Sequence, residues 1–269
     1  MAFLALTGCE SLPFVAVDEP IDEIEVTAEP RLELITVAHE LREIPVYVPP
    51  GPPDILDELR ARFELEYDSD EKRIVAQRNW FVRHPEYLER VFSRSQRYMP
   101  FIRDELDRRG LPMELALLPI VESAYDPFAY SHGRAAGLWQ MIPGTARRFG
   151  VKQNWWYDGR RDIVDSTRAA LDYLEYLYEL TDGDWLNAIA SYNSGEGNVL
   201  RAQRRNAAAG KPTDFWHLRV PKETRAYVPK LLALVDIVRD PAKYGLELPT
   251  VVDTPQFVVN DIGSQLDLA

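Results

Sequence analysis

Apolar residues recur at three- and four-residue spacing along most of the chain after Ile55, and this spacing is typical of amphipathic α-helices. The longest such stretch covers 71–109, and Gly110 is expected to end it. The two-residue alternation of a half-buried strand is scarce before residue 247. We therefore predict an all-α fold. Shorter helices are predicted at 113–123, 166–180, 184–192 and 224–238.

Local signals refine these boundaries. Asp184 is a favourable N-cap, Gly195 stops the helix that follows it, and Pro119 interrupts the apolar helix before Glu122. Extended pieces are predicted at Leu34–Val37, at Val251 and Val252, and at 257–259.

No fixed repeat period is visible along the chain, so a helical-repeat scaffold protein is disfavoured.

The segment before the helices has a different composition. Residues 10–56 contain 8 of the 20 prolines and 11 Asp and Glu residues against 2 Lys and Arg, a balance of -9. Such a segment cannot bury enough apolar surface to fold alone, so we predict a disordered leading linker. The net charge of -12 thus belongs mostly to this linker, and the helical body is near neutral. Nucleic-acid binding is disfavoured, because it requires a basic face and none stands out in the sequence.

The N-terminus suggests attachment to a membrane by a lipid. Residues 1–9 form a short apolar run that ends in Leu6-Thr7-Gly8-Cys9, which resembles the cleavage box of bacterial lipoproteins. The run is short and lacks a basic start, so we predict a partial signal with Cys9 as the lipidated residue. Cys9 is also the single cysteine. The four histidines are not spaced as ligands, so we predict no metal and no cofactor.

The segment around Glu122 is a candidate for acid–base chemistry. This glutamate directly follows five apolar residues, and burial at a helix end would raise the pKa of its carboxyl, as a general acid near neutral pH requires. The pattern alone also fits a surface glutamate at the end of a core helix. Three further segments carry polar residues beside glycines or helix starts, at 137–143, 190–197 and 223–230.

In this order and spacing the four segments resemble the catalytic domain of family 1 lytic transglycosylases, which have a goose-type-lysozyme-like fold. The similarity covers about residues 56–245 and is greatest to a membrane-bound subgroup. It implies a lysozyme-like helical catalytic domain that cleaves peptidoglycan. The resemblance implies that Glu122 is the catalytic residue, because it matches the position of the family's catalytic glutamate. The substrate-binding residues implied by the resemblance are Ser123, Ser131, Gln140, Met141, Tyr192, Asn193 and Tyr227.

Two departures from the family pattern stand out. Ser191 replaces the usual alanine of the Ala-Tyr-Asn motif, and the glycan-binding LysM modules of the subgroup are not present. The predicted organisation is a partial lipoprotein signal (1–9), an acidic Pro-rich linker (10–55), a helical extension (56–107), the catalytic domain (108–245) and an extended tail (246–269).

The resemblance implies a mechanism with one carboxylate, because only Glu122 matches a catalytic position. Asp126 is expected to act in a turn beside Pro127, Glu196 to lie in a loop, and Glu223 to start a helix. The 2-acetamido group and the 6-hydroxyl of N-acetylmuramic acid would supply the other reacting groups, giving a 1,6-anhydro product. Two alternatives remain: a goose-type hydrolase of the same bond, and a non-catalytic peptidoglycan-binding protein.

The expected partners are therefore peptidoglycan glycan strands and, through Cys9, a membrane. The expected location is the periplasmic face of the bacterial cell envelope, as an outer-membrane lipoprotein, because Glu10 rather than aspartate follows Cys9. The chain is expected to be a monomer.

Overall fold

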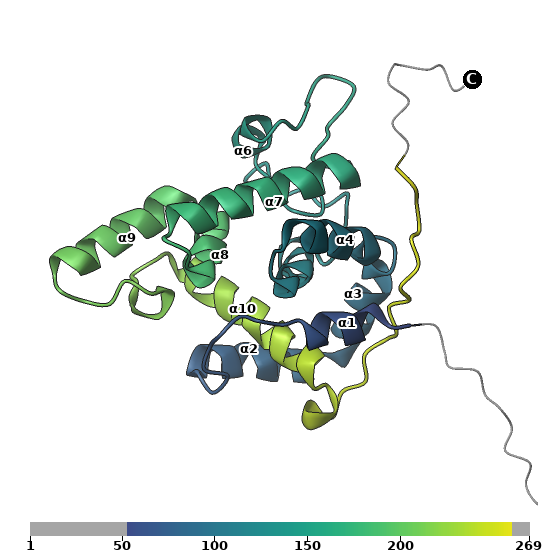
Figure 1. The fold of residues 1–269 in the computed structure, drawn as a ribbon, viewed down its shortest axis with the longest axis horizontal. Helices are drawn as coiled ribbons and strands as arrows, with labels where there is room; N and C mark the ends of the chain where they lie inside the picture. The colour runs from purple at the N-terminus through teal and green to yellow at the C-terminus, as the bar shows by residue number, and fades with distance from the viewer. Residues whose placement is uncertain (1–52, 260–269) are drawn as a thin grey trace, which may run out of the picture. The chain divides into compact units, whose positions relative to one another are not determined.

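The computed structural model describes residues 53–259, and these form α-helices joined by loops and short 3₁₀ turns (Figure 1). Within this range the only β pairings are isolated bridges, so the all-α prediction is confirmed. The helices are α1 (Ile55–Ala61), α2 (Lys72–Val82), α3 (Pro85–Ser95), α4 (Met99–Arg109), α5 (Leu118–Ser123), α6 (Pro143–Arg148), α7 (Ile163–Leu180), α8 (Trp185–Ser194), α9 (Glu196–Ala208) and α10 (Lys222–Arg239), and the 3₁₀ turns are Met113–Leu117, Phe215–His217 and Ala242–Tyr244.

Helix α10 lies at the centre of the packing. Its residues from Tyr227 to Val238 are almost all buried, and it packs along α2 and against α8 and the turn before α5. Apolar side chains from Ile55 to Val251 join one continuous core, so the helices before and after α4 share their interior. The predicted domain boundary after residue 107 falls in the last turn of α4.

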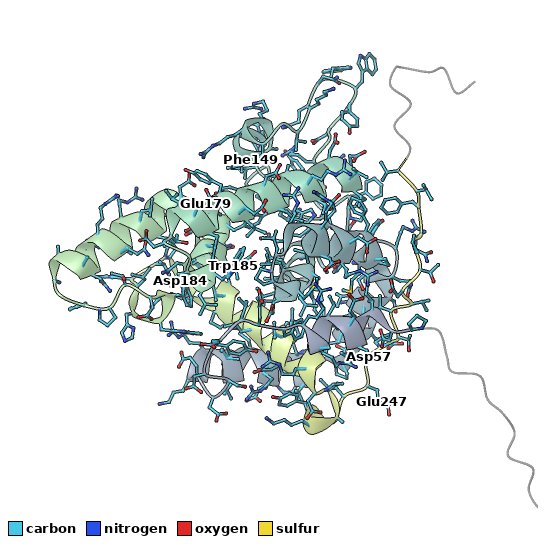
Figure 2. The ribbon with its side chains drawn as sticks, viewed as in Figure 1. Asp57, Phe149, Glu179, Asp184, Trp185 and Glu247 are labelled. Atoms are coloured by element: carbon cyan, nitrogen blue, oxygen red, sulfur yellow. The ribbon has the colours of Figure 1, made fainter. Side chains whose placement is uncertain are left out.

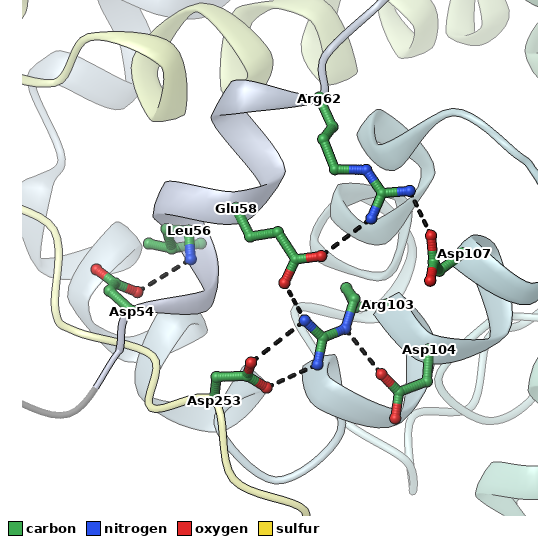
Figure 3. Close-up of polar contacts among 8 residues, drawn as sticks. All are labelled: Asp54, Leu56, Glu58, Arg62, Arg103, Asp104, Asp107 and Asp253. Atoms are coloured by element: carbon green, nitrogen blue, oxygen red, sulfur yellow. Dashed lines mark hydrogen bonds and ion pairs between the residues drawn. The ribbon is translucent and has the colours of Figure 1, made fainter.

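A polar cluster connects α1, α4 and the segment after α10 (Figure 3). Arg103 of α4 contacts Glu58 of α1 and donates to Asp253 at 2.7 Å. Arg62 donates to Glu58 at 3.0 Å and to Asp107 at 2.5 Å. These half-exposed pairs add modest stability each, but together they hold the start of α1 beside the C-terminal segment.

Two breaks divide the stretch that the sequence predicts as one helix over 71–109. Pro85 opens α3, and a residue before proline is disfavoured in helical geometry, so His84 takes φ -131° and ψ 59°. Pro100 likewise sits in the first turn of α4, where its missing N–H costs nothing. Gly110 ends α4 in the left-handed conformation, as predicted.

The interpretation of Glu196 as a loop residue is wrong, because Glu196 is the first residue of α9. Gly195, at φ 79°, ends α8 and also precedes α9, so a single residue separates the two helices. The acidic side chain in the first turn of α9 is favoured by the helix dipole. Neither α9 nor the short α6 is predicted from the sequence.

Other boundaries agree with the sequence. Asp184 caps α8, where its carboxylate accepts from the Asn187 N–H at 3.0 Å, and Trp185 follows it (Figure 2). Pro119 lies in the first turn of α5, directly after a 3₁₀ turn. Val252 forms only an isolated bridge with Asp54. No helix within 53–259 is long and apolar enough to cross a membrane. Cys9, residues 10–52 of the predicted linker and the strand predicted at 34–37 lie outside the described residues. The last residue of the predicted linker, Ile55, begins α1.

Candidate active site

A cleft of about 610 Å³ brings together segments that are far apart in the sequence. Its walls come from the end of α5, the loop at 131–142, the start of α6, the junction of α8 with α9, and the start of α10. Seven of the eight site residues predicted within the described range line it. They are Glu122, Ser131, Gln140, Met141, Tyr192, Asn193 and Tyr227.

Glu122 lies in the last turn of α5, immediately before a tight reversal of the chain. Ala124 and Tyr125 both have positive φ, 52° and 57°, which is uncommon outside glycine. Tyr125 is buried and its hydroxyl donates to the Ala116 carbonyl at 2.6 Å, which holds the reversal in place. Backbone strain of this kind persists where the surroundings fix it, here directly after the carboxylate.

The pKa of Glu122 is raised from 4.5 to about 7. Burial is the largest cause, because desolvation disfavours the charged carboxylate. The Tyr227 hydroxyl donates a hydrogen bond to Oε1, which lowers the pKa, and the nearby charge of Glu223 raises it. The carboxyl is thus about half protonated near neutral pH, and it can both give and accept a proton there.

Three residues of α10 share the face that meets Glu122. Glu223, Tyr227 and Lys230 are spaced by four and three residues, so they lie one turn apart on the same side. Burial and the charge of Glu122 raise the pKa of Tyr227, which keeps its hydroxyl protonated as a donor. Burial lowers the pKa of Lys230, against the opposing effect of Glu122. The involvement of Lys230 is missed by the sequence analysis, although its spacing from Tyr227 is a signal.

Gln140 lies opposite in the loop wall and has φ 47°. Its side-chain NH₂ donates to the carbonyls of Gly137 at 2.9 Å and Ala129 at 3.2 Å. These two bonds orient the amide and leave its oxygen as the group available to the cleft. Gly137 is required here, because its φ is 82° and a Cβ would lie 1.8 Å from the Arg160 carbonyl oxygen.

The C-terminal end of α8 supplies Tyr192 and Asn193. The Tyr192 hydroxyl donates to the Trp139 carbonyl at 2.8 Å, which connects α8 to the Gln140 loop. The Asn193 side-chain oxygen accepts from the Thr224 hydroxyl at 2.8 Å. Asn193 therefore retains its two N–H donors for a ligand, while Tyr192 fixes the position of the wall.

Ser123 is the predicted site residue that does not line the cleft. Its hydroxyl donates to the Leu138 carbonyl at 2.8 Å and accepts from the Asp126 N–H at 3.2 Å. Ser123 thus joins the Glu122 turn to the loop that carries Gln140. Asp126 accepts from the Phe128 N–H at 2.9 Å, which is the turn role expected of it.

Two other carboxylates line the cleft. Glu196 accepts from the Tyr173 hydroxyl at 3.1 Å and pairs with Arg148 at 3.2 Å, so its charge is already engaged. Glu223 is exposed in the first turn of α10, which agrees with its prediction as a helix-start residue. Across 53–259, no three His, Cys, Asp or Glu side chains are grouped to hold a metal ion.

Several known proteins are similar to this chain. Residues 99–215 match the family model of the transglycosylase SLT domain. The chain is 48% identical over 197 residues to membrane-bound lytic murein transglycosylase D of Escherichia coli, a match that covers 73% of this chain but 44% of that protein. It thus spans less than half the length of this relative.

A second relative is matched over most of its length. The chain is 40% identical over 167 residues to an Alteromonas sp. protein named for tributyltin chloride resistance, covering 62% of this chain and 79% of that protein. The lytic transglycosylase Slt of Pseudomonas aeruginosa is a structural neighbour, with a TM-score of 0.43 and 24% identity over 73% of this chain and 34% of that chain. From the family model and the sequence relatives, the chain belongs to the family of SLT-domain lytic transglycosylases.

Proposed function

We propose that this protein is a peptidoglycan lytic transglycosylase that cleaves the β-1,4 bond between N-acetylmuramic acid and N-acetylglucosamine. One observation carries the proposal. Glu122 lies in the cleft with a pKa of about 7 and accepts a hydrogen bond from Tyr227. A carboxyl with this pKa can protonate a leaving group and then act as a base.

In the proposed reaction Glu122 first donates its proton to the glycosidic oxygen as the bond from that oxygen to C1 of the muramic sugar breaks. The 2-acetamido group of the same sugar stabilises the positive charge at C1. Ionised Glu122 then takes the proton from the 6-hydroxyl, whose oxygen bonds to C1. No water is consumed, and the products are a 1,6-anhydro sugar and a free 4-hydroxyl. Internal attack is favoured because the 6-hydroxyl and C1 belong to the same sugar residue.

Tyr227 supports both halves of this cycle. Its hydroxyl donates to Glu122 and so stabilises the carboxylate that forms after the first proton transfer. The free N–H groups of Asn193 and the side-chain oxygen of Gln140 are suited to the carbonyl and N–H of acetamido groups. We propose that these two amides select N-acetylated sugars, with Ser131 and Met141 lining the same groove.

Hydrolysis of the same bond is the alternative. An inverting or retaining hydrolase uses a second carboxylate, and Glu223 is the candidate because its charge acts on Glu122. Glu196 is a weaker candidate since Arg148 and Tyr173 engage it. The lyase reaction is favoured because it requires only the carboxyl of Glu122, whose pKa is raised to about 7.

Product masses test the proposal. Purified peptidoglycan is digested with the wild type, with Glu122→Gln and with Glu223→Gln, and the released muropeptides are weighed. We expect anhydro ends, one water lighter than reducing ends, from the wild type and from Glu223→Gln, and no release from Glu122→Gln. Reducing ends, lost in Glu223→Gln, would identify a hydrolase. Binding of peptidoglycan without release by the wild type would identify a non-catalytic binding protein.

We also propose that the protein is held on the periplasmic face of the outer membrane by a lipid on Cys9. The lipoprotein-like box and the word membrane-bound in the relatives' names support this. Membrane fractionation tests it: Cys9→Ser is expected to move the protein into the soluble periplasmic fraction. An unchanged distribution would refute the anchor. We propose a monomer, for which light scattering during gel filtration is the measurement.

A further inference from the structure

The loop between α6 and α7 exposes two adjacent tryptophans. Trp155 is 87% exposed and Trp156 is 90% exposed, the highest values among the large apolar side chains described. Figure 1 shows this part of the chain extending away from the helices. Soluble proteins rarely expose large apolar side chains next to each other, and where they do, the exposed patch often marks a binding site.

The loop is held in one shape by its own hydrogen bonds. The side-chain oxygen of Asn154 accepts from the N–H groups of Trp156 and Tyr157, each at 2.8 Å. The Asn154 N–H in turn donates to the Tyr157 carbonyl at 2.8 Å. An Asx turn of this kind satisfies the backbone locally, so the tryptophans are presented by a defined turn. Little ordering entropy would then be lost when a ligand binds.

The base of the loop is connected to the wall of the cleft at two points. Gln153 pairs with Asp158 across the loop, and its side-chain NH₂ donates to the Pro143 carbonyl at 3.4 Å, next to cleft residue Ile142. Arg160 pairs with Asp158 at 2.7 Å and also donates to the carbonyl of cleft residue Met141 at 3.2 Å. The tryptophans thus project from the same wall that carries Gln140.

We propose that Trp155 and Trp156 form an outer subsite that stacks on sugar rings of the glycan strand beyond the cleft. This inference rests on the proposed function, because it needs a polysaccharide substrate. A cleft of about 610 Å³ has the size of a small-molecule pocket, whereas a glycan strand continues past it. The two rings stand 6.3 Å apart at 87°, so they offer flat apolar faces in two directions to the C–H faces of sugar rings.

A lipid surface is the other ligand that exposed tryptophans can meet, and the local charge disfavours it. Within the loop at 149–162, Lys152, Arg160 and Arg161 stand against Asp158 and Asp162, and Arg160 is paired with Asp158. This balance falls short of the cluster of basic side chains that attracts anionic lipid. Beneath the loop the Tyr157 hydroxyl donates to the Asp165 carboxylate at 3.2 Å. Asp165 is exposed, so its carboxylate would be repelled by anionic headgroups.

Double substitutions of Trp155 and Trp156 distinguish aromatic stacking on sugar rings from general apolar contact. Trp155→Leu with Trp156→Leu keeps apolar side chains without aromatic faces, whereas Trp155→Phe with Trp156→Phe keeps the faces. Both pairs are made in the Glu122→Gln background, so that binding is measured without turnover. Trp80→Leu is the matched control, because Trp80 is a partly exposed tryptophan of α2, which does not line the cleft.

Binding is measured on long glycan strands, on the corresponding tetrasaccharide, and on vesicles of phosphatidylethanolamine and phosphatidylglycerol. We expect the leucine pair to weaken binding of long strands by about tenfold or more, with tetrasaccharide binding unchanged, while the phenylalanine pair and Trp80→Leu stay within about threefold of the parent. Equal strand binding by the leucine pair and the parent would overturn the subsite. So would a loss confined to vesicles. The muropeptide masses test the proposed lyase activity separately, so its failure is distinguished from failure of the subsite.

Discussion

Replacing Glu122 with glutamine is expected to stabilise the folded protein at alkaline pH while removing its activity. The carboxyl is buried enough to raise its pKa to about 7, so ionising it in the folded state costs free energy. Glutamine has nearly the same shape, remains neutral at every pH, and can accept the hydrogen bond from Tyr227. The variant therefore removes the cost of ionisation without leaving a cavity or an unpaired hydroxyl.

The magnitude follows from the two pKa values. The ordinary pKa of 4.5 applies to the unfolded chain, and the value of about 7 applies to the folded chain. Between these values the folded chain binds more protons than the unfolded chain, so the free energy of unfolding falls as pH rises. The difference corresponds to about 3 kcal/mol, absent below pH 4 and complete above pH 8.

Urea unfolding at pH 4.5, 6 and 8 measures this difference. We expect Glu122→Gln to lie within about 0.5 kcal/mol of the wild type at pH 4.5 and to exceed it by about 3 kcal/mol at pH 8, or by about 6–12 °C in melting temperature. Glu89→Gln on the exposed face of α3 is the control for the loss of one carboxylate. A Glu122→Gln variant that is less stable at pH 8, or equally shifted at every pH, would refute the assignment of Glu122 as a buried, protonated acid.

Two further substitutions test the surroundings of Glu122. Tyr227→Phe removes the hydrogen bond that lowers the pKa of Glu122. The alkaline limb of the pH–activity profile should therefore move to higher pH by about one unit. A limb at the same pH as in the wild type would contradict this. Gly137→Ala places a Cβ 1.8 Å from the Arg160 carbonyl at a φ of 82°, so thermal unfolding should show a loss of more than about 2 kcal/mol; a melting temperature equal to that of the wild type would contradict the required close approach.

The parts of the fold that were predictable are those with local signals. Asp184, Gly195 and Gly110 mark helix ends through side-chain capping and left-handed geometry, which depend only on neighbouring residues. The breaks at Pro85 and Pro100 have equally local causes, but the apolar spacing runs through them and hides them. Helix α9 escaped prediction because much of its length is exposed, so its apolar stripe is narrow.

The site was predictable in a different way. Motifs that resemble a family predict seven of the residues that line the cleft, and the apolar run before Glu122 is the only physical signal in the sequence for its raised pKa. Ser123 shows the limit of motif reasoning, since adjacency in sequence to Glu122 does not place its hydroxyl in the cleft. The effects of Glu223 and Lys230 depend on how α10 meets α5, which local patterns do not specify.

The two walls of the cleft differ in how they are supported, and this difference has a consequence for how substrate preference can change. Tyr227, which contacts Glu122, belongs to the central α10. Core contacts and the buried Arg78–Asp236 ion pair at 2.5 Å hold this helix in place. On the opposite wall, backbone hydrogen bonds join Gly137 to Ala129 and Ala136 to Met141, and residues 136–139 are buried. Residues 132–134 of the same loop are exposed. Loop walls tolerate substitution better than packed helices. Changes in which glycans bind should therefore arise at the exposed positions 132–134 and in the loop at 152–158, whereas changes beneath α10 should alter the pKa of Glu122 and the rate of bond cleavage itself.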